Sequence, residues 1–301
     1  MTGVGLALPQ IGPHLDSSVL REFVVEAERM GFTSLWVQDH FLKPVDPVIG
    51  YVGQDRPIPE QYGTVWSATE LMAAAAAWSS RALIGSSVLV GGYHYPAQLA
   101  GRLATVDQLS GGRLVVGLGA GWCAEEHAAV GVDVRTRGRR MDDFVPALLA
   151  CWGEDPVEHE GPFFRIEPAE VRPKPVQAPR PPMICGGFSP SALARTARWF
   201  DGWNPAGAPI RAVLKARDTL AGLRDPGLPP VEIWHHLFTQ APGGTGPDRT
   251  VDDLAAEVSQ AASEGFREVI VDASFSTGIT RPEDWADLPG RLRPLLDAAL
   301  G

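Results

Sequence analysis

The sequence contains only three cysteines, Cys123, Cys151 and Cys185, among its 301 residues. Their odd number and their spacing argue against a disulfide framework, and no set of histidines and carboxylates is spaced like metal ligands. We therefore predict neither a disulfide nor a metal site. A reducing cytoplasm is the simplest compartment for such a chain.

Long apolar runs are missing as well, because no stretch of about 18 apolar residues occurs that could span a membrane. The first residues, MTGVGLALPQIGPHLD, have no basic lead and no long apolar centre, so we expect no secretory signal. Basic residues are the minority charge, and the formal net charge is -10 at pH 7. That charge argues against a nucleic-acid partner and against an anionic membrane surface.

Eight short apolar segments alternate with helical patterns along the chain. We predict them as strands at residues 3–9, 32–38, 82–90, 113–118, 182–185, 202–204, 231–238 and 268–272. Such alternation implies a parallel α/β sheet, and closure into a (β/α)8 TIM barrel is the natural solution. We expect one barrel domain over residues 1–301, with an open doubly wound sheet as the alternative. Two segments rich in proline and glycine, 42–63 and 153–181, are predicted as insertion loops.

The stretch PMICGGFSPSALARTARWFDGWNP, residues 182–205, holds the clearest candidate for a binding site. A short strand turns through Gly186 and Gly187 into a helix, with Ser189 suited to its cap and Pro190 to its first turn. The helix start adds partial positive charge, and glycine lets an anion approach the backbone closely. We interpret the turn as a phosphate cradle; a plain tight turn between strand and helix is the alternative.

In a barrel, the chemistry is assembled on the loops after the carboxyl ends of the strands. Here those ends are rich in glycine, aromatic residues and titratable groups, including Asp39-His40, Gly119-Ala120-Gly121-Trp122 and Gly186-Gly187. Such a composition is typical of a pocket for a flat, phosphorylated ligand.

Four strings, LWVQDHF, SSVLVGGYHYPAQLAGRLATVDQLSGGRLVVGLGAGW, RGRRMDDF and ICGGFSPSALARTARWFDGWNP, carry a family resemblance. The sequence resembles the luciferase-like monooxygenase superfamily over nearly its whole length. It is most similar to the branch of oxidoreductases that depend on the deazaflavin coenzyme F420. The resemblance implies a (β/α)8 barrel, a flavin or deazaflavin cofactor and, commonly, a homodimer.

The resemblance also assigns site residues. The segment matching the one that binds the cofactor phosphate is Gly186, Gly187, Phe188 and Ser189. Positions around the cofactor ring are matched by Asp39 and His40 after the second strand, by Ser87, Val88 and Val90 in the third strand, and by Gly119, Ala120 and Gly121 after the fourth. The Ser87–Val88 position often carries a cis peptide in the family, so we predict a cis bond or a bulge there.

His40 is the predicted catalytic residue, because an unperturbed imidazole titrates near neutrality and suits proton transfer beside a hydride site. Asp39 either orients His40 or caps a turn. The predicted walls of the substrate pocket are His14, Tyr51, Trp122 and Trp203. His235 and His236 lie within one strand, so at most one of them faces the barrel interior.

One departure from the family limits what the resemblance implies. F420-dependent sugar-phosphate dehydrogenases carry an acidic Glu where this chain has Trp122, so that particular chemistry is not implied here. Three functions stay open: hydride transfer between F420 and a small organic substrate, an FMN-dependent monooxygenase supplied by a partner reductase, and a binder of a phosphorylated ligand without catalysis. Asp39-His40 favours F420.

Overall fold

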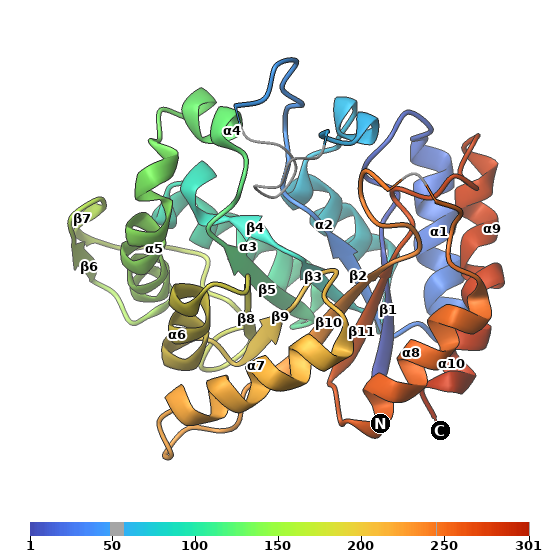
Figure 1. Cartoon of the computed structure of the whole chain (residues 1–301). Coiled ribbons are helices and arrows are strands. Elements are labelled where there is room, and N and C mark those ends of the chain that lie inside the picture. Colours follow the sequence, from blue (N-terminus) through green and yellow to red (C-terminus); the bar gives the residue numbers. More distant parts are fainter. Residues whose placement is uncertain (49–56, 245, 301) are drawn as a thin grey trace.

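The structure is a computed structural model, and it describes residues 1–48, 57–244 and 246–300. Parallel strands close into a barrel surrounded by helices, as Figure 1 shows. The barrel strands are β1 (Gly3–Ala7), β2 (Ser34–Val37), β3 (Leu83–Ser86), β4 (Leu89–Val90), β5 (Leu114–Gly119), β8 (Met183–Gly186), β9 (Gly202–Asn204), β10 (Glu232–Phe238) and β11 (Glu268–Asp272). Because β3 and β4 are two halves of one strand, both pairing with β5, the barrel has the eight strands that the sequence predicted. The predicted (β/α)8 fold is confirmed.

Helices follow the strands where the local signals place them. The longer ones are α1 (Ser17–Met30), α2 (Ala68–Trp78), α3 (Pro96–Ser110), α5 (Arg137–Trp152), α6 (Pro190–Trp199), α7 (Ile210–Leu223), α8 (Val251–Ser263) and α9 (Glu283–Leu292), and the short α10 (Pro294–Ala298) follows α9. The Asp16 side chain caps α1, and Gly31 ends it with a φ of 105° that suits glycine. Thr250 and Asp253 form a reciprocal capping box at the start of α8. No helix in the described ranges is long and apolar enough to cross a membrane.

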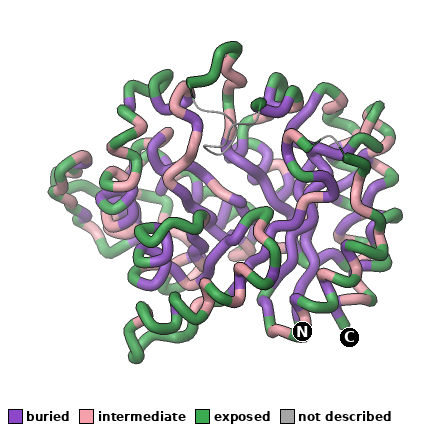
Figure 2. Tube along the Cα trace, in the orientation of Figure 1, coloured by how far each residue is buried: buried purple, intermediate pink, exposed green. Residues whose placement is uncertain are grey.

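The core has two layers, and Figure 2 shows the buried strands in the middle of the molecule. Inside the barrel lies a small apolar cluster made of Trp36, Val115, Ile184, Trp234 and Ile270. The larger cluster fills the space between the barrel and the helices, where side chains such as Phe23, Leu103 and Phe144 are fully buried. Successive strand residues alternate between these layers, so the chain positions one side chain in two toward the barrel axis.

The predicted loop 153–181 contains regular structure that the sequence did not reveal. An antiparallel hairpin is formed by β6 (Val157–Glu160) and β7 (Arg165–Ala169). Asp143 of α5 fixes it, because its carboxylate contacts His159 Nε2 at 2.8 Å and accepts from the backbone N–H of Phe163 at 2.7 Å. The many prolines of the segment obscured this hairpin. The predicted loop 42–63 ends in a 3-10 turn, Glu60–Gly63, and residues 49–56 within it lie outside the described residues.

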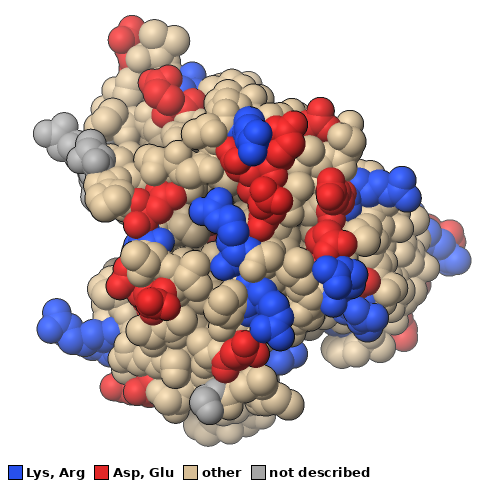
Figure 3. All heavy atoms as spheres, turned by 90° about the vertical axis from the view of Figure 1, so that its right-hand side faces the viewer, with Lys and Arg blue, Asp and Glu red and all other residues tan. Residues whose placement is uncertain are grey.

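Charged side chains of both signs are interspersed on the face of the molecule shown in Figure 3. Exposed ion pairs occur along the helices of the chain, as in Arg29 with Glu26 and Arg293 with Asp297. Because water screens such exposed pairs, they contribute little to stability. The net negative charge does not form a single acidic patch on this face.

Glu268 is a buried carboxyl group at the amino-terminal end of β11. Its Oε1 accepts hydrogen bonds from the hydroxyls of Thr33 and Ser34, each at 2.5 Å. Gly3 leaves room for it, because a Cβ on Gly3 would overlap Oε2 at 2.0 Å. Burial raises the pKa of Glu268 from its ordinary 4.5 to about 7, and the two hydroxyls only partly oppose the effect.

The raised pKa predicts a pH-dependent stability. Between pH 4.5 and about 7 the folded chain keeps a proton on Glu268 that the unfolded chain has lost, so the free energy of unfolding falls as pH rises. The total loss amounts to about 3 kcal/mol. We expect Glu268→Gln to remove this loss, so that the variant exceeds the parent in stability at pH 8 and matches it near pH 4.5.

Urea unfolding of both proteins at several pH values between 4.5 and 8 measures the effect. The exposed Glu232→Gln, at the same end of the barrel, serves as the control and should leave the slope unchanged. A parent whose stability does not decline over this range would contradict the assignment.

Candidate active site

His40 follows β2 at the carboxyl end of the barrel and forms a pair with a buried glutamate. Its Nδ1 lies 3.0 Å from Oε2 of Glu126, which comes from the short helix α4 (Ala124–Ala129) and has a fully buried side chain. Glu126 also accepts hydrogen bonds from the backbone N–H of Phe41 and the hydroxyl of Tyr93, each at 2.8 Å. Burial acts to raise the pKa of Glu126, but the contact with His40, together with the hydrogen bonds from Phe41 and Tyr93, outweighs burial and holds the pKa below its ordinary value. Glu126 is therefore an ionised partner for His40.

Asp39 points to a different histidine. Its Oδ2 lies 2.8 Å from Nε2 of His94 and also accepts from the backbone N–H of Val90 at 2.8 Å. The alternative that Asp39 orients His40 is therefore wrong in this structure, because Glu126 takes that position. Asp39 instead ties the end of β2 to β4 and to the turn that carries His94. Asp39 and His94 thus form a second histidine–carboxylate pair at this end of the barrel, beside His40 and Glu126.

The Ser87–Val88 peptide is cis, which confirms the prediction for the third strand. The Val88 side chain lies against two glycines of neighbouring strands. A Cβ on Gly119 would come within 2.7 Å of Val88 Cγ2, and a Cβ on Gly186 within 3.1 Å. The structure therefore brings together three of the predicted cofactor positions, Val88, Gly119 and Gly186.

The turn after β5 is held against the third strand. Gly121 has a φ of +73°, and a Cβ there would come within 2.6 Å of Val90 Cγ1. The carbonyl of Ala120 lies 3.1 Å from Nε2 of His127. The predicted residues Val90, Ala120 and Gly121 thus form one packed edge beside Val88.

The Gly186–Gly187 turn has the geometry expected of a cradle. Gly187 has a φ of +115°, a conformation that favours glycine. Ser189 caps α6, because its Oγ accepts from the backbone N–H of Ala192 at 3.1 Å. Gly187, Phe188 and Ser189 are exposed, so an anion can reach the start of this helix.

Trp203 does not fit its predicted place in a pocket wall. The side chain is fully buried in the layer between the barrel and the helices. Its Nε1 donates to the carbonyl of Gly187 at 2.8 Å, and its ring centroid lies 4.8 Å from that of Phe188. Because alternate residues of β9 face opposite sides, Trp203 supports the cradle from behind rather than lining the pocket.

Aromatic side chains border His40. Its ring centroid lies 4.5 Å from that of Tyr62 and 5.6 Å from that of Trp122. Tyr62 in turn contacts Phe275, with 5.4 Å between the ring centroids. Trp122 thus lies beside His40, and its place in the wall of a substrate pocket stays a prediction. Of the other predicted wall residues, His14 is half-buried in the loop after β1. Tyr51 lies outside the described residues.

His236 and not His235 faces the barrel interior, in line with the alternation expected along the strand. His236 Nδ1 lies 2.7 Å from Ser87 Oγ, and its Nε2 lies 3.1 Å from Asp272 Oδ2. His235 instead points outward to Glu257 of α8, at 3.3 Å.

Sequence reasoning missed several residues of the site. They are Glu126, His94, Asn204 and Asp272, whereas His236 was considered as one of two strand histidines. The available signal was their position, because Asn204 and Asp272 are the last residues of their strands and Glu126 follows the end of β5 within one short helix.

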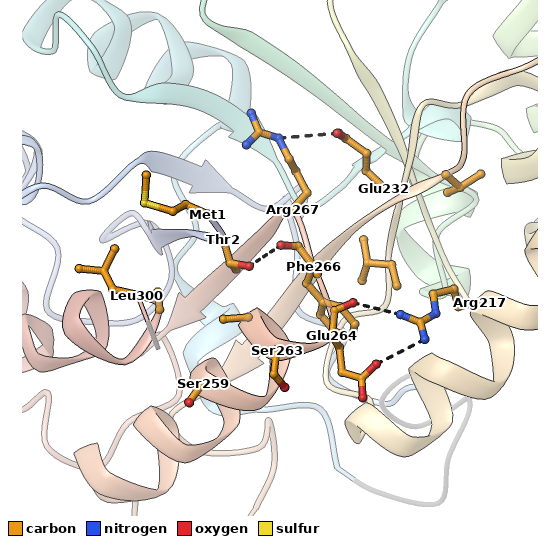
Figure 4. Close-up of a pocket in the computed structure, with 15 residues that line it drawn as sticks. Met1, Thr2, Arg217, Glu232, Ser259, Ser263, Glu264, Phe266, Arg267 and Leu300 are labelled. Carbon is orange, nitrogen blue, oxygen red and sulfur yellow. Dashed lines mark hydrogen bonds and ion pairs between the residues drawn. The ribbon is translucent and has the colours of Figure 1, made fainter.

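A cavity lies at the opposite end of the barrel, as Figure 4 shows. Its volume is about 480 Å³, and it opens at the amino-terminal ends of β10 and β11. Its arginines are paired, Arg217 with Glu264 at 3.4 Å and Arg267 with Glu232 at 3.8 Å. A smaller cavity of about 340 Å³, bordered by Ile58, Gln240 and Phe275, lies next to the aromatic cluster. In a barrel, chemistry is assembled at the carboxyl ends of the strands, so the cavity at the amino-terminal ends of β10 and β11 is not the candidate active site.

The chain is similar in sequence to an uncharacterized protein, to a monooxygenase and to a dehydrogenase. An uncharacterized protein of Mycobacterium tuberculosis is 30% identical over 260 residues, covering 79% of this chain and 90% of that protein. An FMNH2-dependent dimethylsulfone monooxygenase of Pseudomonas putida is 28% identical over 88% of this chain and 70% of its own length. An F420-dependent glucose-6-phosphate dehydrogenase of Amycolatopsis mediterranei is 30% identical over 67% of this chain and 56% of its own length.

Solved structures share the fold. A monooxygenase from Streptomyces bottropensis superposes with a TM-score of 0.79 over the whole of both chains at 21% identity. An F420-dependent secondary alcohol dehydrogenase, solved with an F420-acetone adduct, superposes with a TM-score of 0.73 over 99% of both chains at 17% identity.

The family model for luciferase-like monooxygenases matches residues 1–241, which include both histidine–carboxylate pairs, the Ser87–Val88 peptide and the Gly186–Gly187 turn. This chain belongs to the luciferase-like monooxygenase family.

Proposed function

We propose that the protein is an oxidoreductase that transfers a hydride between coenzyme F420 and a small organic substrate. The observation that carries the proposal is the His40–Glu126 pair, because an imidazole held by a buried carboxylate can move the proton that accompanies hydride transfer. F420-dependent enzymes are among the relatives of the chain.

The residues present fit a cofactor with a flat ring and a phosphate. Gly187 and the capped start of α6 form an exposed cradle that a side chain at Gly187 would obstruct. Val88, packed on Gly119 and Gly186, offers an apolar support for a ring. We assign the phosphate to the cradle residues Gly186, Gly187, Phe188 and Ser189, and the ring to the residues around Val88. When bound, a deazaflavin supplies the hydride chemistry.

The remaining steps belong to the protein. The carboxylate of Glu126 accepts from Nδ1 of His40, so that nitrogen carries a proton and Nε2 is left to exchange one with the substrate. The hydrogen bonds from Phe41 and Tyr93 keep the carboxylate in place. The rings of Tyr62 and Trp122 exclude water on one side of His40 and favour an organic substrate.

An FMN-dependent monooxygenase is the second candidate. The dimethylsulfone monooxygenase matches a larger share of this chain than the dehydrogenase does, 88% against 67%. In that case a partner reductase would supply the reduced flavin, and the cradle and the ring support would serve FMN. The third function considered, binding without catalysis, leaves the buried Glu126 partner of His40 without a role.

Titration of the purified protein with F420 and with FMN, followed by fluorescence quenching, tests the proposal. We expect saturable quenching by F420 and little or none by FMN. Saturable binding of FMN alone would favour the monooxygenase. Failure to bind either cofactor, oxidised or reduced, would contradict both enzyme functions.

Gly187→Asp should abolish cofactor binding while the chain still folds. The carboxylate would repel a phosphate and fill the space that the backbone leaves open. The matched control is Gly265→Asp, which places the same side chain at a glycine with a φ of +73° at the other end of the barrel. Isothermal titration of both variants, with circular dichroism as the check on folding, gives the answer. Unchanged affinity in a folded Gly187→Asp protein would refute the phosphate cradle.

His40→Ala should lower turnover at saturating cofactor by about 10²–10⁴-fold, the usual contribution of a general acid or base, with little change in cofactor affinity. Glu126→Gln should lower turnover less and should change its pH dependence, because the amide cannot hold Nδ1 of His40 as a carboxylate does. Glu125→Gln, one residue away on α4, is the control that should leave both unchanged. If His40→Ala weakens cofactor binding but turns over normally at saturation, His40 is a binding residue and not the proton carrier.

A further inference from the structure

A chain of hydrogen bonds runs through the barrel interior at the Ser87–Val88 peptide, and the proposed chemistry does not use it. His236 of β10 links Ser87 Oγ, at 2.7 Å, to Asp272 of β11, at 3.1 Å. Ser87 Oγ also contacts Asn204 Oδ1 of β9 at 2.9 Å, and Asp272 Oδ2 accepts from Gln38 Nε2 at 2.7 Å. All five side chains are buried. Buried polar groups have to be matched donor to acceptor, so the proton positions in this chain can be worked out.

Asn204 fixes the direction of the chain at one end. Its Nδ2 donates to the backbone carbonyl of Trp234 at 2.8 Å, so its oxygen and not its amino group faces Ser87. Ser87 has one hydroxyl proton, and it must donate that proton to Asn204 Oδ1. Otherwise two oxygen lone pairs would face each other at 2.9 Å. The contact between Ser87 Oγ and His236 Nδ1 is then a hydrogen bond only if Nδ1 is the donor.

Asp272 fixes the other end. Its Oδ1 accepts from the backbone N–H of Ser274 at 2.7 Å, and its Oδ2 accepts from Gln38. One proton therefore lies between His236 Nε2 and Asp272 Oδ2, and a second lies on Nδ1. His236 and Asp272 together therefore hold two protons. A neutral imidazole beside an ionised carboxylate would hold only one.

We propose that His236 is a positioning residue that donates from Nδ1 to Ser87 and thereby holds the Ser87–Val88 peptide in place. Asp272 keeps the imidazole oriented for this donation. The consequence rests on the proposed function: the peptide that His236 holds carries Val88, the side chain assigned to support the cofactor ring. Loss of the Nδ1 donor should loosen that support without touching the cofactor directly.

Two substitutions separate the two ring nitrogens. His236→Asn places an amide nitrogen near the position of Nδ1 and retains a donor for Ser87, whereas His236→Gln reaches toward the position of Nε2 and loses that donor. We expect His236→Gln to weaken the binding of F420 or FMN by roughly tenfold, and His236→Asn to bind within about threefold of the parent. The control is His235→Gln, which removes the neighbouring buried histidine that faces Glu257 and should leave affinity unchanged. Equal affinity losses in His236→Asn and His236→Gln would make the role merely structural and would overturn the proposal.

A second measurement needs no cofactor. Nitrogen-15 NMR of the histidine-labelled protein, with the His236 signal assigned by its loss in His236→Gln, reports which ring nitrogens carry protons. We expect a proton on Nδ1 of His236. A ring protonated on Nε2 alone would overturn the proposal whatever the cofactor. If the parent protein binds neither F420 nor FMN, the proposed function fails, and the NMR result alone then decides the protonation of His236.

Discussion

The closure of the barrel at β3, β4 and β5 is the constraint on which the site depends. Both halves of the third strand pair with β5, but the register changes between them: Gly85 pairs with Val115, whereas Leu89 pairs with Leu118. Four steps along one strand therefore match three steps along the other, so one residue is extra and the strand bulges. The bulge interrupts the alternation of side chains along the strand, and it places the Val88 side chain against Gly119 and Gly186. Glycine at both neighbouring positions follows from this local crowding.

Two buried carboxyl groups of the barrel, Glu126 and Glu268, differ in pKa because their surroundings differ. Glu126 is buried but receives hydrogen bonds from an imidazole, an amide and a hydroxyl, which together hold it ionised. Glu268 is equally buried at the other end but receives only two hydroxyls, so burial dominates and its pKa rises. Of these two buried carboxyl groups, the one that is held ionised therefore lies at the carboxyl end of the strands, where chemistry is expected.

Local signals were enough to predict much of the fold. Ser189, Pro190 and the two preceding glycines lie within five positions of one another, and the structure forms the capped turn that they encode. His40 and Glu126 are 86 residues apart, and no local pattern links them. Their contact arises only when the barrel brings the ends of β2 and β5 together, so the sequence could indicate His40 but not its partner. The hairpin in 153–181 was missed for a similar reason, because Asp143 of a preceding helix holds it.

Period-two alternation explains which neighbouring residues can take part in the site. In β9, Trp203 packs toward the helices while Asn204 reaches Ser87 inside the barrel. In β10, His235 faces α8 while His236 faces the bulge. Residue type alone therefore does not indicate which side chain belongs to the site, since two adjacent histidines have different surroundings. The register of each strand, set by its pairing with its neighbours, decides which of them can act on the proposed cofactor site.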